Sequence, residues 1–95
     1  MIALLTGEIR SLSNDKVVID VAGVGYLVTV TPQTSSKLAM GTRMSLHTSM
    51  VVREDSMTLY GFIEEPSRNL FESVQTVSGI GPKVALAIVS AFCLL

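Results

Sequence analysis

Apolar residues recur at every second position through most of residues 1–63, and from residue 64 onward they recur at helical spacing. A period of two places the apolar side chains of a strand on one face, whereas a spacing of three and four gathers them along one side of a helix. We therefore expect a sheet-forming domain over residues 1–63 and a helical one over residues 64–95. Because the chain has only 95 residues, its core is small, and marginal stability or support from an oligomer is expected.

The first part of the chain contains five runs with strand character. Gly7 lies inside the first run, where a glycine often marks a bulge or a sharp bend. A Gly-Val-Gly turn at residues 23–25 is expected to join the second and third runs, and a short helical turn is expected within residues 31–41. Five strands with a helix between the third and fourth indicate a closed Greek-key barrel of oligonucleotide-binding (OB) type, although a small open sheet would show the same pattern. The expected strands cover residues 3–13, 16–22, 26–30, 44–54 and 56–63.

The second part of the chain is expected to form two helices joined by a tight connection. The first helix should carry an apolar stripe and end before Gly79, and Pro82 should open the second, as a first-turn proline does. The second helix is apolar on nearly all sides and therefore needs covering by further chain or by another subunit. Because no capping glycine and no basic last turn occur near Leu95, we favour further chain, rather than another subunit, as the cover for this helix. The stripe of the first helix consists of Leu70, Phe71, Val74 and Val77.

The connection between these helices, "SGIGPK" (residues 78–83), has the composition of a phosphate-binding loop. Glycine at positions 79 and 81 permits left-handed backbone angles and close approach of a ligand. Ile80 is expected to turn inward, while the amide N–H groups at the start of the next helix and the Lys83 charge face an anion. Such turns also join helices that bind nothing. The chain lacks the Gly-Lys-Ser/Thr of a nucleotide-hydrolysing loop, so no cofactor is expected and any ATP would be used by a partner.

A second unusual feature is the pair of adjacent acids, Glu54 and Asp55, which follows Arg53 between two expected strands. A solvated turn is the ordinary explanation of such a pair. A metal-dependent nuclease site that also recruits Asp20 or Glu8 is an alternative of a different class, but neighbouring acids on one strand point to opposite faces.

Composition restricts the function further. The seven Lys and Arg residues nearly balance eight Asp and Glu residues, so nucleic-acid binding would need a local basic cluster repeated in several copies. Cys93 is the only cysteine, which excludes a disulfide framework or a zinc set within this sequence; we expect it to be a small buried residue. The single histidine, His47, is expected to be an ordinary strand residue. A cytoplasmic location is expected because no stretch resembles a signal peptide or a membrane span.

Four segments, in their order and spacing, give the chain a close resemblance to the RuvA family of bacterial Holliday-junction-binding proteins. The first comprises Met1, Ile2, Leu5, Gly7 and Ile9, and the others read "VIDVAGVGYLV" (18–28), "VVREDSMTLYGF" (51–62) and "LFESVQTVSGIGPKVALAI" (70–88). The resemblance implies an OB barrel, residues 1–63, that forms a homotetramer or, as two tetramers face to face, an octamer. It also implies that residues 64–95 are the first of two helix-hairpin-helix motifs gripping the arms of four-way junction DNA. A third domain, which contacts a RuvB-type AAA+ motor, would be missing here.

The resemblance also implies roles for individual residues. Glu54 and Asp55 match the acidic pin that lies near the tetramer centre and repels DNA phosphates, with Arg53 beside them. The expected function is a non-catalytic, sequence-independent junction-binding subunit for branch migration in bacterial recombination and repair. A protein-interaction barrel, or a nucleic-acid-binding module without junction specificity, is the alternative. The DNA-binding positions carried over are Arg53, Ser78, Gly79, Ile80, Gly81 and Lys83.

Overall fold

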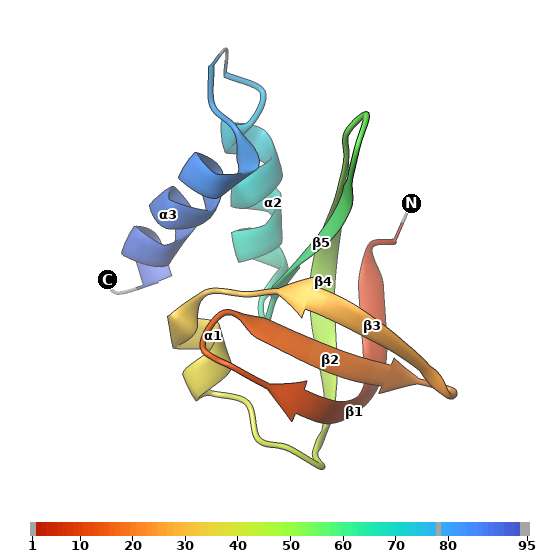
Figure 1. The fold of residues 1–95 in the computed structure, drawn as a ribbon. Helices are drawn as coiled ribbons and strands as arrows, with labels where there is room; N and C mark the ends of the chain where they lie inside the picture. Colours follow the sequence, from red (N-terminus) through yellow and green to blue (C-terminus); the bar gives the residue numbers. More distant parts are fainter. Residues whose placement is uncertain (1, 78, 94–95) are drawn as a thin grey trace.

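Five strands close into a barrel in the computed structural model, which describes residues 2–77 and 79–93 (Figure 1). The strand order is β1-β2-β3-β5-β4, and β1 pairs with β4 to close the barrel. All neighbours are antiparallel except β3 and β5. The predicted closed barrel is confirmed, and the open sheet is excluded. The strands are β1 (Leu4–Leu12), β2 (Lys16–Val21), β3 (Val24–Thr29), β4 (Arg43–Val52) and β5 (Met57–Phe62).

The expected helical turn between the third and fourth strands is α1 (Pro32–Ser36). It begins because Pro32 presets a helical φ and because the Thr31 hydroxyl accepts a hydrogen bond from the Thr34 N–H at 3.1 Å. Inside the barrel, the apolar side chains of alternate strand positions meet in one cluster, as a period of two requires. Its buried strand members are Leu5, Ile9, Val17, Ile19, Val28 and Leu46, and Val30 and Leu38 join it from the segments before and after α1.

The predicted turn over residues 23–25 is wrong by one position. The turn consists of Ala22 and Gly23, which have φ values of 53° and 92°, and Gly25 is already in β3 opposite Asp20. Two central residues with positive φ form the two-residue turn that matches the twist of a hairpin. The Asp20 carboxylate holds it by accepting a hydrogen bond from the Gly23 N–H at 2.8 Å.

Gly7 marks a close approach of two strands, whereas the bulge in β1 lies later, between Ile9 and Ser11. A Cβ atom at Gly7 would lie 2.1 Å from the backbone oxygen of Asp20. We expect Gly7→Ala to lower the free energy of unfolding by about 1–3 kcal/mol, because backbone must move to admit the methyl group. Urea denaturation measures this loss.

The matched control for Gly7→Ala is Gly25→Ala, where the nearest atom to an added Cβ is the side-chain Cγ1 of Val18 at 3.2 Å. A side chain can rotate away, so the loss should be smaller. Equal losses at both positions would contradict the close approach.

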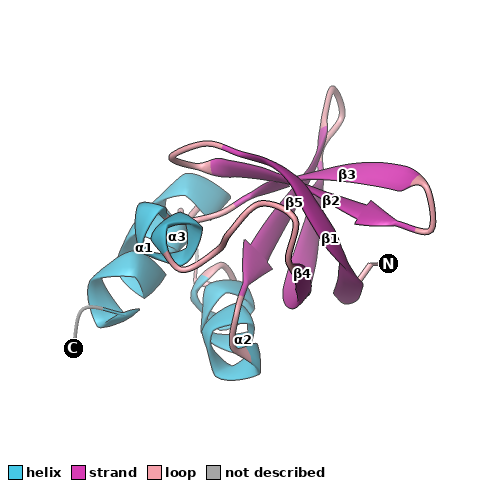
Figure 2. Cartoon of the chain, turned by 90° about the horizontal axis from the view of Figure 1, so that it is seen from below, coloured by secondary structure: helices cyan, strands magenta, loops and turns pink. Residues whose placement is uncertain are grey.

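Two helices, α2 (Glu65–Val74) and α3 (Pro82–Cys93), pack against the barrel, and Figure 2 shows all three helices on one side of it. Phe71 is fully buried, and its ring centre lies 4.9 Å from that of Tyr60 and 5.2 Å from that of Phe62. These rings form a second apolar cluster together with Ala85 and Val89 of α3. This cluster contains residues from both sides of the predicted domain boundary between residues 63 and 64. The division into two domains at that boundary remains a prediction.

Helix α2 is shorter than expected. It ends at Val74, and Val77 lies outside it and is exposed. The Thr76 hydroxyl and N–H both donate to the Ser73 carbonyl, at 2.7 and 3.1 Å, and so replace the next helical hydrogen bond with a turn. Helix α3 starts at Pro82, as predicted.

Polar contacts fix α2 on the barrel. The Arg68 guanidinium donates to the carbonyls of Ala3 and Thr48 at 3.2 and 3.3 Å, and the Ser49 hydroxyl donates to Glu72 at 2.9 Å.

No helix in the described part of the chain is long and apolar enough to cross a membrane. The expectations for Ser78 and for the side chain of Cys93 lie outside the described residues.

Candidate nucleic-acid interface

The acidic pair lies at the tip of the hairpin formed by β4 and β5, which projects beyond the barrel (Figure 1). The Arg53 N–H donates to the Ser56 carbonyl at 2.7 Å and closes the turn, which leaves Glu54 and Asp55 exposed. Among the described residues, no ion pair involves either acid. Both charges therefore act on the solvent or on a ligand, and neither is needed to hold the turn.

The connection between α2 and α3 exposes one glycine and partly buries its neighbour. Gly79 has φ of +86°, is exposed and would have no atom within 4 Å of an added Cβ. Ile80 packs against the second apolar cluster, as expected, and its N–H donates to the Val77 carbonyl at 3.2 Å. Gly81 does not adopt the positive φ considered for it; its backbone instead passes close to Arg53, whose Nη2 would lie 3.7 Å from an added Cβ.

The first turn of α3 presents unused hydrogen-bond donors. Its first internal hydrogen bond runs from the Ala85 N–H to the Gly81 carbonyl at 3.0 Å. The amide N–H groups of Lys83 and Val84 have no acceptor among the residues that the structure describes. Lys83 adds a positive charge to a helix end that is already positive, and no acid lies in this turn. The arrangement is unfavourable by itself and is relieved by an anion.

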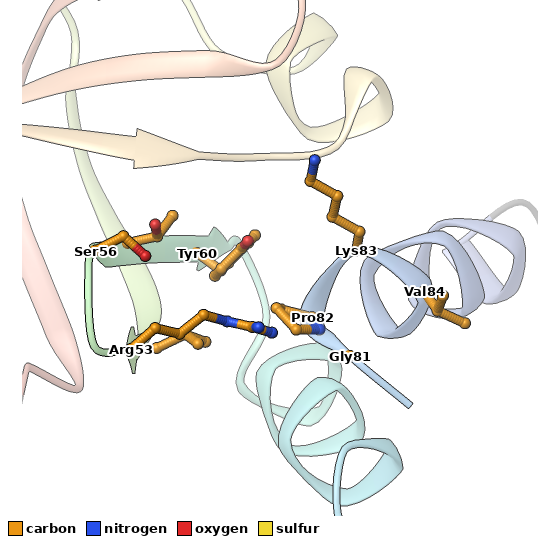
Figure 3. A pocket seen from close by; sticks show the side chains of 9 residues that line it. Arg53, Ser56, Tyr60, Gly81, Pro82, Lys83 and Val84 are labelled. Atoms are coloured by element: carbon orange, nitrogen blue, oxygen red, sulfur yellow. The ribbon is translucent and has the colours of Figure 1, made fainter. Parts of the chain in front are cut away.

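A cleft of about 380 Å³ separates β5 from the start of α3 (Figure 3). Arg53 reaches into it from the hairpin, and Lys83 borders it from the helix. Within the described chain, Arg10, Lys16 and Arg68 form ion pairs with carboxylates, but Arg53 and Lys83 form none. The cleft therefore carries two uncompensated positive charges. It is lined by Val51, Arg53, Ser56, Thr58, Tyr60, Gly81, Pro82, Lys83 and Val84.

Sequence reasoning identified Arg53, Gly81 and Lys83 but missed the floor of the cleft. Ser56, Thr58 and Tyr60 line it from the barrel side. Thr58 and Tyr60 differ by two positions, so they fall on one face of β5, and Ser56 lies in the turn just before that strand. That spacing is visible in the sequence, but only the docking of α3 shows which face it approaches.

Glu8 and Asp20 of the alternative nuclease site lie opposite each other on β1 and β2, but they are not brought to Glu54 and Asp55. Glu8 and Asp20 form ion pairs with Arg10, at 3.5 and 3.0 Å. In the register of β1 and β4, Glu8 lies opposite Arg43 at the start of β4. Glu54 follows the opposite end of β4. No group of three or more His, Cys, Asp or Glu side chains that could hold a metal occurs in the described residues.

Comparison with protein-family models shows to which family the chain belongs. The sequence model described as "RuvA N terminal domain" matches residues 1–61, which is more than half of the chain. The chain belongs to the RuvA N-terminal domain family. The matched segment comprises the barrel except for Phe62, the last residue of β5, and includes the hairpin with the two acids.

Curated relatives extend the similarity to RuvA beyond the barrel. The chain is 49% identical over 90 residues to a protein of Nocardia farcinica, covering 95% of this chain and 45% of the relative. A Mycobacterium ulcerans protein is 51% identical over 90 residues, with 95% and 46% coverage, and a Streptomyces avermitilis protein is 48% identical over 90 residues, with 95% and 44% coverage. Each is named Holliday junction branch migration complex subunit RuvA. The chain spans about half the length of these relatives.

Proposed function

We propose that this chain is the junction-binding part of a RuvA-type subunit. It binds four-way junction DNA without sequence preference, as a homotetramer, and serves branch migration in recombination and repair without catalysing a reaction itself. The names of the curated relatives support the DNA substrate. The family's barrel and the two helices that follow it support separate roles for these two parts of the chain.

The observation that carries the proposal is the separation of opposite charges on neighbouring elements. Arg53 and Lys83 both line the cleft beside the first turn of α3, and neither forms an ion pair with a carboxylate in the part of the chain that the structure describes. Glu54 and Asp55 project from the adjoining hairpin tip. One group of residues attracts phosphate and the other repels it, so the protein favours DNA whose strands separate near the acids.

In this proposal, α2 and α3 form a helix-hairpin-helix motif. Its connection, including Ser78, Gly79, Ile80 and Gly81, lies against the DNA backbone, and the first-turn N–H groups of α3 receive a phosphate. Phosphate contacts carry no base information, which accounts for binding without sequence preference.

A single motif of this kind binds weakly, and repetition supplies the affinity. Each neutralised phosphate contributes roughly −0.9 to the slope of log K against log salt, so one subunit holds DNA by only a few such contacts. Four copies on one rigid platform add avidity without new kinds of contact. The same symmetry gathers four pairs of Glu54 and Asp55 as an acidic pin at the centre. A RuvB-type ATP-driven motor is proposed as the partner that moves the DNA.

Replacing Lys83 by alanine tests the binding surface. We expect the slope of log K against log salt for four-way junction binding to become shallower by about 0.9 per bound subunit, because one phosphate contact is lost. Fluorescence anisotropy at four or more salt concentrations measures it.

The control for Lys83→Ala is Lys37→Ala, since Lys37 is also exposed but lies outside the cleft. An equal change in both variants, or none in Lys83→Ala, would remove Lys83 from the contact surface. Absence of salt-dependent DNA binding in the full-length relatives would favour a protein-interaction barrel instead.

A further inference from the structure

Tyr60 combines deep burial with a hydroxyl group that the fold leaves unused. Only 7% of the residue is exposed, and its ring packs against Phe71. None of the hydrogen bonds among the described residues involves its hydroxyl oxygen, yet this oxygen is not sealed from solvent. Buried tyrosine hydroxyls usually have a partner. This hydroxyl is therefore available to water or to a ligand that enters the cleft.

The hydroxyl opens onto the cleft between the two cationic side chains. Figure 3 shows Tyr60 on the cleft floor, with Arg53 on one side and Lys83 on the other. Tyr60 and Lys83 also line an adjoining cleft of about 510 Å³ that continues toward Lys16 and Thr29 at the barrel edge. Lys83 therefore stands between two connected hollows, and Tyr60 forms part of the floor of both.

The groups around the hydroxyl are suited to an anion. No carboxylate lines the cleft between β5 and α3. Asp15, in the adjoining cleft, is paired with Lys16 at 3.4 Å, and Glu54 and Asp55 lie in the turn beside Arg53. Thr58 lies on the same face of β5 as Tyr60, and Ser56 lies in the turn just before this strand; both also line the cleft with their hydroxyl-bearing side chains. The Lys83 and Val84 N–H groups add donors without acceptors in the described chain. Donors and positive charge thus surround one hollow.

We propose that this cleft seats one phosphate group of the DNA backbone, and that the Tyr60 hydroxyl donates a hydrogen bond to it between Arg53 and Lys83. This inference rests on the proposed function and adds a barrel residue to the DNA-contacting surface. A phosphate held there bridges β5 and α3. Because Arg53 directly precedes Glu54, a DNA strand that leaves the cleft passes next to the turn that carries Glu54 and Asp55.

Tyr60→Phe tests the contact while retaining the ring that packs on Phe71. We expect affinity for a four-way junction at fixed salt to fall at least about threefold, as for the loss of one or more hydrogen bonds. The salt slope should stay unchanged because no charge is removed. Arg53→Gln should instead make that slope shallower by about 0.9 per bound subunit.

Tyr26→Phe is the matched control, because Tyr26 packs against the barrel cluster and lines neither cleft. It should bind junctions as the unaltered chain does. If Tyr60→Phe binds as tightly as Tyr26→Phe, the contact is excluded while the proposed function stands.

Inorganic phosphate separates the site from the proposed function. In ¹H–¹⁵N NMR spectra of the 95-residue chain, phosphate should shift the amide resonances of Lys83 and Val84, and more phosphate should be needed in Tyr60→Phe; the dispersion of the spectra also shows that the variant is folded. If the unaltered chain binds no junction but still shows these Tyr60-dependent shifts, the junction function fails and the phosphate site survives with another source of phosphate. If phosphate shifts neither resonance, or shifts them equally in the variant, the site is overturned.

Discussion

Replacing Phe71 by alanine should lower the free energy of unfolding by about 3–5 kcal/mol, the range for loss of a fully buried aromatic ring. This ring lies 4.9 Å from Tyr60 and 5.2 Å from Phe62, so it is the main apolar connection between α2 and β5. Small domains are stabilised by only about 5–15 kcal/mol, so the loss is a large part of the total. Urea denaturation followed by circular dichroism measures it.

The part of the fold that Phe71→Ala destabilises most can also be predicted. The barrel has its own cluster of buried side chains, which does not include Phe71. We expect hydrogen exchange to increase first in α2 and α3, with the barrel strands less affected. Phe92→Ala is the control, because Phe92 is 59% exposed and such surface changes alter stability by only about 0.5 kcal/mol. A similar small loss for Phe71→Ala, or uniform exchange throughout the chain, would contradict this account of how the helices are held.

Changing Glu54 to Gln and Asp55 to Asn together should increase affinity for plain duplex DNA by roughly tenfold or more at low salt, and reduce the preference for junctions. A single pair of unit charges about 8 Å apart in water contributes only ~0.5 kcal/mol. In the proposed tetramer, eight carboxylates acting on several phosphates add up to a few kcal/mol within a Debye length of about 8–10 Å. Anisotropy titrations with both DNA forms measure the ratio of affinities.

The structure makes this double change a clean test. Neither acid is in an ion pair with another described residue, and the turn is closed by backbone atoms of Arg53 and Ser56. Stability should therefore remain unchanged. Sedimentation must first show the same oligomeric state in both proteins. The control is the other adjacent acidic pair, Glu64→Gln with Glu65→Gln, at the opposite end of α2 from the connection to α3. An unaltered ratio of junction to duplex affinity would disprove the role of the acids.

Several features could be predicted from the sequence because they depend on neighbouring residues. Alternation of apolar side chains defined the strands, and Pro82 defined the start of α3. Two charged residues between alternating runs have to lie in a turn, which placed Glu54 and Asp55 correctly on an exposed tip. Where local patterns misled, a specific hydrogen bond was responsible: the Asp20 carboxylate holds the turn at Gly23, and Thr76 ends α2 before Val77.

Other features depended on how distant segments meet. The need for a glycine at position 7 comes from the backbone of Asp20, which only strand pairing brings close. The cleft between Tyr60 and Lys83 exists because Phe71 and Arg68 fix the helices on the barrel. The sequence by itself determined the elements and the charges they carry, since periodicity, turns and helix starts are local. Tertiary structure alone decided which charges lack partners and which hydroxyl faces them, because long-range packing sets those distances.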